Sequence, residues 1–386
     1  MTADKPAAEE AVPAQELKAY LPIKTLSLRP WGKGRFSVYV RKGNGLVLYA
    51  TRGAAFSADQ LSRLRAMGVA TVYIHKGEMR HYENYLREAL GEVLLDESIP
   101  LADRAEVWHA SAANLARGVL EEKLPHSLSR SRFDQVGKLV RQSIGFLQGP
   151  DAVKNVAKLI SKGYQEYQHG LAVMVLTSLV LMDRPGVDEE LLVKVGVGAL
   201  LHDVGKLGLP EGLLERRPDG WAPEEETAFR SHPALGVGLC VGLPLPPETL
   251  HCILFHHEQE DGKGFPAGLP SAGIPNYVKA LAVCNTYDAL TRACVWRPAY
   301  PPFEALRKME ARKETLDKAF FKRLIMILAD AEVLQGGGKA AKKGELPPTP
   351  QPPQTAQAAP PAGPAQPAGS PQAPPAPGAN ANGQGS

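Results

Sequence analysis

The sequence predicts a mainly α-helical protein that begins with a small α/β module. Two observations carry this prediction. Between Tyr20 and His75 the chain has short runs of β-forming residues interrupted by turn residues. From Arg80 onward no strand pattern recurs, and apolar residues repeat every three or four positions over long stretches. The remainder of the folded chain is therefore expected to be helical.

The N-terminal module is predicted to hold a hairpin, a helix and a further strand. Residues 36–40 (FSVYV) and 46–49 (LVLY) are strand-like, and residues 42–45 (KGNG) between them are typical of a hairpin turn. A helix is expected to begin after Ser57, which can act as an N-cap. Residues 69–74 then return to a strand pattern.

Shifts in composition divide the chain into five predicted segments. Both ends are rich in Ala and Pro, and such segments bury too little apolar surface to fold. Helical spacing continues between them through residues 82–95, 102–122 and 131–146. The predicted segments are 1–18, disordered; 19–80, a small α/β regulatory module; 81–150, a helical connector; 151–334, a helical domain that carries the chemistry; and 335–386, a disordered tail.

Charge and composition exclude several classes of protein. Lys and Arg number 44 against 41 Asp and Glu, so a formal charge of +3 gives no large basic field for binding a nucleic-acid polymer. The longest apolar run, residues 171–182, is too short to span a membrane and is expected to form a buried helix. The start lacks a secretory signal and the four cysteines show no CxxC spacing. A cytoplasmic protein is predicted.

A His-Asp pair stands at the end of an apolar helical run that starts at Leu191. Residues 201–206 read LHDVGK. Imidazole nitrogens and carboxylate oxygens are good ligands for Fe, Mn or Zn, and neighbouring side chains on a helix diverge by about 100°, so both can reach one metal cluster. Lys206 follows Asp203 by one turn, where it could hold a phosphate oxygen. The alternative is a buried helix end with one salt bridge.

Residues 256–266, HHEQEDGKGFP, form a second and longer motif. Together with residues 202–206 it resembles the HD-GYP domains, a bacterial branch of the HD phosphohydrolase superfamily, which carry HDxGK and then HHExxDGxGYP. Phe265 stands in place of the tyrosine. The two glycines would let the backbone turn tightly beside a phosphate or base, and the proline would fix the loop exit. A generic Gly-rich turn is the alternative.

The resemblance implies an all-helical HD-GYP domain and a set of site residues. It extends to His169, before an apolar helix, and to His232, which stands between a predicted N-cap, Ser231, and Pro233. Alone, each would more commonly be a core histidine. His251 has no counterpart and is expected to be structural. The implied metal ligands are His169, His202, Asp203, His232, His256 and His257; the catalytic residues are Lys206 and Asp203; the substrate contacts are Lys206, Asp261, Gly262, Gly264, Phe265, Pro266 and Arg297.

The sequence departs from the family pattern at three places. The family usually completes its site with an Asp ligand, where this chain has Asn285, a neutral ligand that would hold cations less tightly. Asp288, one turn on, is not expected to compensate. A Glu that adds a third metal in some members corresponds to Gln165, so two metals are expected. The family's RPY segment appears as residues 297–300, RPAY, interrupted by one extra residue.

The resemblance implies a phosphodiesterase with two divalent transition metals, Fe or Mn, that opens cyclic di-GMP to the linear dinucleotide and on to GMP. Two alternatives stay open: a catalytically weak domain that binds cyclic di-GMP or signalling protein partners, favoured by Asn285 and Phe265, and a phosphohydrolase acting on another nucleotide. The N-terminal module is expected to be regulatory. Its basic residues are interpreted as a solvated surface and not as a nucleotide face: Lys24, Arg29, Lys33, Arg35 and Arg41.

Overall fold

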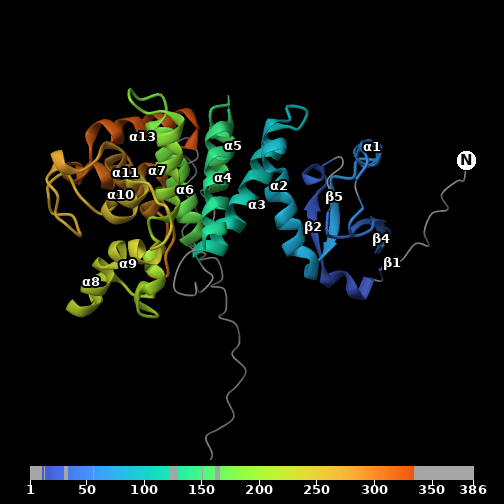
Figure 1. Ribbon diagram of the computed structural model, residues 1–386, viewed down its shortest axis with the longest axis horizontal. Helices are drawn as coiled ribbons and strands as arrows, with labels where there is room; N and C mark the ends of the chain where they lie inside the picture. The colour runs from blue at the N-terminus through green and yellow to red at the C-terminus, as the bar shows by residue number, and fades with distance from the viewer. Residues whose placement is uncertain are drawn as a thin grey trace, which may run out of the picture. The chain divides into compact units, whose positions relative to one another are not determined.

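The structure, a computed structural model, describes residues 11–12, 14–29, 34–54, 56–120, 129–149, 151–160 and 166–333. Within these ranges the chain forms one five-stranded sheet at its N-terminal end and thirteen α-helices (Figure 1). The predicted class, mainly α with a small α/β module, is confirmed. No described helix is both long and apolar enough to cross a bilayer. The predicted disordered tail lies outside the described residues.

The sheet is antiparallel throughout, with strand order β1-β4-β3-β5-β2. The predicted hairpin is present, because Lys42 pairs with Gly45 across a two-residue turn. The last strand of the module, β5, lies between β3 and β2, so strands that are far apart in the sequence are neighbours in the sheet. The strands are β1 (Ala11–Val12), β2 (Tyr20–Lys24), β3 (Val38–Lys42), β4 (Gly45–Ala50) and β5 (Thr71–His75).

Part of the segment expected to be disordered is ordered. Ala11 pairs with Val47 and Val12 with Leu46, so β1 covers the outer edge of β4. An exposed strand edge offers unpaired N–H and C=O groups, which is a reason for so short a strand to form there. A 3-10 helix, η1 (Ala14–Ala19), leads on to β2. The composition of residues 1–18 gives no indication of this pairing.

Helix α1 (Ala58–Ala66) begins where the sequence places it. Ser57 Oγ accepts a hydrogen bond from the Gln60 amide at 3.1 Å, and the Ser57 amide donates to Gln60 Oε1 at 2.9 Å. This reciprocal capping box satisfies two of the amide groups that a helix N-terminus leaves without intrahelical partners. Leu61 and Leu64 of this helix are buried.

Four helices follow the sheet: three lie largely within the predicted connector, 81–150, and the fourth begins the predicted segment 151–334. In Figure 1, α3, α4 and α5 lie beside one another, and α3 and α4 also pack on helices of the C-terminal part, α6 (Glu166–Leu181) and α7 (Glu189–Leu201). The four helices are α2 (Met79–Leu95), α3 (Leu101–Leu120), α4 (Arg130–Leu147) and α5 (Ala152–Ile160).

Two residues of the N-terminal module that lie outside its strands, Phe36 and Arg29, contact α2 and its C-terminal end. The ring of Phe36 makes edge contacts with Tyr82 and Tyr85 of α2, with centroids 5.4 and 5.3 Å apart. Arg29 is only 5% exposed and pairs with Asp96 at 2.8 Å. The interpretation of Arg29 as part of a solvated basic surface was therefore wrong: its charge is used inside the protein, at the end of α2.

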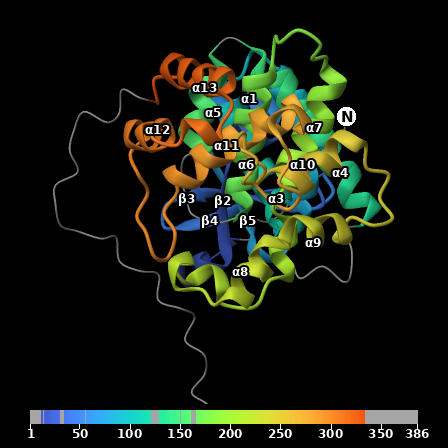
Figure 2. The same ribbon diagram turned by 90° about the vertical axis from the view of Figure 1, so that its left-hand side faces the viewer.

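The C-terminal part is built around α6, whose residues 169–181 are buried on all sides. Such a helix carries apolar residues around its whole circumference, as the sequence of residues 171–182 predicted. In Figure 2, α10 and α11 lie next to α6 and α7, with which they pack. The helices of this part are α6 (Glu166–Leu181), α7 (Glu189–Leu201), α8 (Pro223–Arg230), α9 (His232–Leu239), α10 (Pro247–Phe255), α11 (Asn276–Thr291), α12 (Pro302–Glu310) and α13 (Lys318–Asp330). Its 3-10 turns are η4 (Val204–Gly208), η5 (Leu213–Glu215), η6 (Pro218–Gly220), η7 (Ser271–Gly273) and η8 (Lys313–Thr315), and two further turns, η2 (Thr25–Ser27) and η3 (Lys76–Glu78), belong to the N-terminal module.

Candidate metal centre

The HD pair lies where α7 stops and the chain turns. Asp188 caps the start of α7 by accepting from the Leu191 amide, and the helix ends at Leu201 with His202 as its C-cap. Asp203 has φ −98° and ψ 8°, and the 3-10 helix η4 begins after it. The sequence suggests that the pair lies on a regular α-helix. In the structure the pair lies just after the helix ends. The turn itself brings His202 Nε2 within 3.2 Å of Asp203 Oδ2.

Three histidines are oriented by the carbonyl group three residues before them. His202 Nδ1 lies 2.7 Å from Ala199 O, His232 Nδ1 lies 2.6 Å from Phe229 O, and His256 Nδ1 lies 2.9 Å from Ile253 O. A carbonyl oxygen can only accept, so each Nδ1 carries the proton and donates it. Each Nε2 therefore presents its lone pair, which is the form of imidazole that binds metal.

These Nε2 atoms converge on the carboxylate of Asp203. Its Oδ2 lies 3.4 Å from His169 Nε2 and 3.2 Å from His202 Nε2. Its Oδ1 lies 3.3 Å from His232 Nε2 and 3.5 Å from His256 Nε2. Each carboxylate oxygen thus faces its own pair of imidazole nitrogens. Asp203 divides the cluster into an Oδ2 half, with His169 and His202, and an Oδ1 half, with His232, His256 and His257.

The donor set fits a bound cation. The Nε2 atoms of His232 and His256 lie 3.1 Å apart with both Nδ1 protons already committed, so two lone pairs meet with no proton between them. His202 Nε2 and Asp203 Oδ1 are buried and make no hydrogen bond with any described residue. Buried acceptors without donors are costly, and a divalent ion satisfies all of them at once. The cluster can hold a metal.

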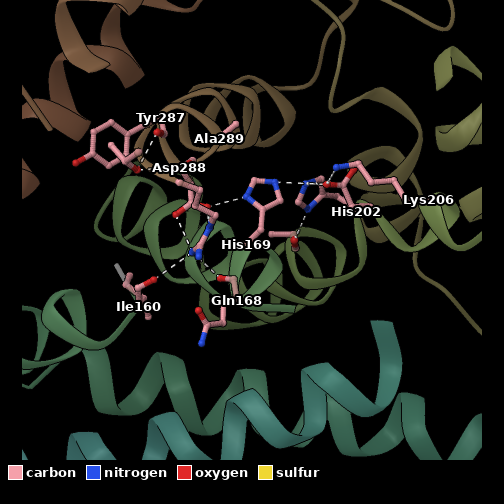
Figure 3. A network of polar contacts seen from close by, with 12 residues as sticks. Ile160, Gln168, His169, His202, Lys206, Tyr287, Asp288 and Ala289 are labelled. Atoms are coloured by element: carbon pink, nitrogen blue, oxygen red, sulfur yellow. Dashed lines mark hydrogen bonds and ion pairs between the residues drawn. The ribbon is translucent and has the colours of Figure 1, made fainter. Parts of the chain in front are cut away.

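His169, on α6, is oriented by side chains from elsewhere in the fold. Its Nδ1 lies 2.7 Å from Asp288 Oδ2, and Figure 3 shows the ring lying between Asp288 and the His202–Lys206 end of the cluster. Asp288 is held in turn by Arg292, whose Nη2 lies 3.1 Å from Asp288 Oδ1 and whose Nε also donates to Oδ2. Arg292 further donates to the carbonyls of Ile160 and Gln168, at 3.1 and 2.8 Å. This side-chain relay ties α11 to α5 and α6.

The two halves of the cluster differ in charge before metal binds. Burial lowers the pKa of His169, but the hydrogen bonds that the protonated ring donates to Asp203 and Asp288 outweigh it and raise the pKa to about 9. Burial and the nearby His202 and His232 lower the pKa of His256 to about 4, although Asp203 opposes the shift. Burial would raise the pKa of Asp203, but His202 and Lys206 hold it well below its usual range. His169 is protonated near pH 7 and His256 is neutral.

His257 and Phe265 form the partly exposed edge of the centre. The two rings are stacked, with centroids 4.4 Å apart and an interplanar angle of 19°. The Arg230 guanidinium lies 4.7 Å from the Phe265 ring centre, within the range of a cation–π contact. Phe265 is therefore a wall of the site. The predicted contacts of this segment with substrate remain predictions.

The loop after His257 is held by a carboxylate that the sequence analysis did not single out. Glu258 is 3% exposed, and its two oxygens accept hydrogen bonds from the amides of Ala267, Gly268 and Leu269 at 2.7, 3.1 and 2.9 Å. A Cβ at Gly264 would lie 2.4 Å from Glu258 Cα. Gly264 thus allows the loop to approach its own backbone. The expected approach of this glycine to a phosphate or base stays a prediction.

Lys206 and Asn285 are two further residues that the sequence assigned to the site. Lys206 Nζ is 2.7 Å from Asp203 Oδ2, as expected for a group one turn further along, and the side chain is 19% exposed. Asn285 lies on α11, one turn before Asp288, and is 8% exposed. Its side-chain amide makes no hydrogen bond with any other residue that the structure describes. Its role as a ligand stays a prediction.

Three further residues singled out in the sequence lie outside the cluster or do not act as expected, and a fourth is not among the described residues. Ser231 does not cap a helix start, because it lies in an αR conformation between α8 and α9 and its hydroxyl donates to Ala228 O at 2.7 Å. The Arg297 guanidinium donates to the carbonyls of Ala289 and Leu290 at the end of α11, so a phosphate contact has no support here. Gln165 lies outside the described residues. His251 donates to or accepts from Tyr277 at 2.7 Å, away from the cluster.

Sequence reasoning missed Glu258, Arg292 and the role of Asp288. One signal was present for the last two, since Asp288 and Arg292 stand four residues apart on a helix and can pair along its face. Nothing in the sequence marked His169 as their target, because it precedes Asp288 by 119 residues.

Residues 154–320 match the family model described as HD domain. A cyclic di-GMP phosphodiesterase of Pseudomonas aeruginosa is 28% identical over 184 residues, which are 47% of this chain and 44% of that protein. A cyclic di-GMP phosphodiesterase of Vibrio cholerae is 37% identical over 121 residues, 29% of this chain and 23% of that protein. A 3'3'-cGAMP-specific phosphodiesterase of the same organism is 33% identical over 118 residues, 30% and 25% of the two chains.

The matched segment thus spans less than half the length of these relatives. Among solved structures, an HDG"Y"P protein from Bdellovibrio bacteriovorus is similar with a TM-score of 0.57 and 23% sequence identity. The similarity covers 80% of this chain and 99% of that one. The likeness in fold therefore extends well beyond residues 154–320.

Proposed function

We propose that residues 154–320, which match the HD domain model, form a metal-dependent phosphodiesterase that opens cyclic di-GMP to the linear dinucleotide and then to GMP. The family match, the similarity to cyclic di-GMP phosphodiesterases of two bacteria and the histidine cluster support the proposal. The match covers less than half the length of these relatives, so the activity of the whole relatives supports the proposal but is not assigned to this chain by similarity.

One observation carries the proposal furthest: Asp203 lies between two separate sets of imidazole nitrogens. A carboxylate with different ligands on each oxygen can bridge two cations, as in two-metal sites that act on phosphate esters. His169 and His202 would hold one cation, and His232, His256 and His257 the other. Nitrogen and carboxylate donors suit Fe or Mn. When bound, the metals supply the positive charge that lowers the pKa of water and polarises a phosphodiester.

The chain's own residues have distinct tasks in this proposal. The Lys206 ammonium lies next to Asp203 and is the cation best placed to donate to a phosphate oxygen as negative charge develops there. Glu258 fixes the backbone of the loop that follows His257, which keeps Asp261, Phe265 and Pro266 in place to shape a substrate site. Phe265 offers a flat apolar ring without the hydroxyl that a tyrosine would add.

The decisive experiment measures metal content and turnover on the same sample. Full-length protein is purified without chelator, its metals are quantified by elemental analysis, and hydrolysis of cyclic di-GMP and of 3'3'-cGAMP is followed with added Mn²⁺ or Fe²⁺. About two metals per chain and faster hydrolysis of cyclic di-GMP support the proposal. His251→Ala serves as control, because it removes a histidine outside the cluster.

Two results would replace the proposal. Tight binding of cyclic di-GMP with two metals and no turnover would make the domain a binding module, the alternative that the sequence left open. Preferred hydrolysis of 3'3'-cGAMP would change the substrate, in line with the relative specific for that nucleotide.

A further inference from the structure

A groove runs along the first turns of α13, between them and the end of α12. It has a volume of about 330 Å³, and none of its lining residues belongs to the histidine cluster. We call it the α13 groove. Its lining has three apolar residues, Leu316, Phe321 and Ile325, and four charged ones, Glu310, Lys313, Lys318 and Lys322.

The apolar residues form the inner surface of the α13 groove. Leu316 and Phe321 are only 7% and 5% exposed, and Ile325 is half-buried against the hydrophobic core. The four charged residues are exposed, so their charged ends stand around the groove and not inside it. An apolar surface bordered by charge suits a ligand that has both an apolar body and a charged group.

Two of the three lysines have no acidic partner. Lys313 Nζ lies 3.4 Å from Glu310 Oε1, so these two charges neutralise each other. The side chains of Lys318 and Lys322 make no ion pair or hydrogen bond with any residue that the structure describes. They stand four positions apart on α13, where like charges share one face of the helix and repel each other. A bound anion would remove that repulsion.

The carboxylate nearest to this lysine pair in the sequence is engaged elsewhere. Asp317 is the N-cap of α13, and its Oδ1 accepts hydrogen bonds from the amides of Ala319 and Phe320, at 2.9 Å each. No acidic residue follows in the first turn of the helix. The positive charge on this face of α13 is therefore available to an anion from outside the chain.

We propose that the α13 groove binds a small amphipathic carboxylate of the medium-chain fatty acid type. Its carboxylate lies between Lys318 and Lys322, and its apolar chain lies on Leu316, Phe321 and Ile325. The volume is at the small end of ligand pockets, which run from about 300 to 1,000 Å³, so the groove takes a small molecule and not a folded partner. Lysine ammonium groups are point charges without the planar fork of arginine, so the apolar surface decides which anion binds.

The α13 groove is connected to the loop that follows the paired histidines. Leu316 follows Thr315, whose carbonyl accepts a hydrogen bond from the Glu260 amide at 3.1 Å. Glu260 belongs to the second sequence motif, which also carries His257 and Phe265. A ligand on Leu316 would therefore contact the segment that supports this loop. The binding proposal itself does not depend on the proposed hydrolase activity.

The test titrates octanoate into full-length protein by calorimetry. Acetate has the same charged group without the apolar chain, and octanol has the chain without the charge. Lys318→Gln and Lys322→Gln each remove one cation, and Ile325→Ala shortens the apolar surface. Lys138→Gln is the matched control, because it removes an exposed lysine of α4 that also makes no ion pair with a described residue. Thermal unfolding without ligand checks that each variant is folded.

We expect the dissociation constant of octanoate to rise about tenfold in Lys318→Gln and in Lys322→Gln and to stay unchanged in Lys138→Gln. It should also rise in Ile325→Ala, because apolar contact is lost. Acetate and octanol should each bind at least about tenfold more weakly than octanoate. Added salt should weaken octanoate binding, because the two lysines are exposed.

The double substitution His202→Ala, Asp203→Ala should keep the binding of octanoate, so a failure of the metal-centre proposal can be told apart from a failure of this one. Loss of binding in that variant would place the ligand at the metal centre and overturn the proposal. Absence of octanoate binding, equal affinities in all variants, or acetate or octanol binding as tightly as octanoate would each overturn it as well.

Discussion

The two halves of the metal centre are held in different ways. In the Oδ1 half, His232 and His256 donate from Nδ1 to a carbonyl three residues earlier, and His202 of the Oδ2 half does the same. His169 instead donates to Asp288, which comes from another helix and depends on Arg292. Orientation by a nearby carbonyl is local and cannot be removed by changing a side chain. Orientation through Asp288 can be tuned, which makes the Oδ2 half the adjustable one.

The largest effect should come from Asp203, which both halves share. Asp203→Ala removes the only carboxylate common to the two described donor groups, so metal content should fall to background and hydrolysis with it. Elemental analysis after dialysis measures this, with Asp330→Asn as a control at an exposed carboxylate. A variant that keeps one metal per chain would show that the Oδ1 half binds without Asp203, and the bridging assignment would be wrong.

Asp288→Ala should weaken one half only. Loss of an acceptor behind a metal-bound histidine typically costs 10- to 100-fold in metal affinity, and His169 would lose its orienting contact. Titration with Mn²⁺ should then show one weakened site and one near the natural affinity. Two equally weakened sites would contradict the division of the cluster into halves.

Asn285→Asp tests the missing charge. If Asn285 faces the cluster, a carboxylate there should raise metal affinity by on the order of tenfold and increase turnover. Tighter metal without faster hydrolysis would favour the binding-module alternative. No change in either quantity would place Asn285 outside the centre, with Asp288 the only acid of α11 that serves it.

The dependence of metal affinity on pH should also differ between the two halves. With a pKa of about 9, His169 holds a proton below that pH, and a metal must displace it to use Nε2. Affinity of the Oδ2 half should therefore rise by up to about tenfold per pH unit between pH 7 and 8, as the proton concentration falls. His256, with a pKa of about 4, is already neutral there and gives the other half no such slope from its own ring. Calorimetry in buffers of different ionisation enthalpy counts the released protons.

The smallest effect is expected for Arg292→Lys. Lysine keeps the positive charge but lacks the fork that contacts both oxygens of Asp288 and two carbonyls. Metal affinity of the Oδ2 half should fall only a few-fold, with less loss than in Arg292→Ala. If the lysine and alanine variants lose affinity equally while unfolding at the natural temperature, geometry and not charge is what Arg292 supplies.

The sequence by itself determined the helical class, the hairpin and capped helix of the module, and the residues of the two motifs. These features depend on neighbours in the chain. Ser57 caps the helix that begins after it, and its capping partner Gln60 is three residues further along the chain. Short-range geometry of this kind can be predicted from the order of residues.

Only the tertiary structure decided the features that join distant segments. The strand at Ala11 formed because β4 offered a free edge, Arg29 became buried because α2 brought Asp96 to it, and His169 found Asp288 across 119 residues. In each case a charge or an unpaired polar group acquired its partner through packing, and no local pattern in the sequence specifies which partner the fold will bring.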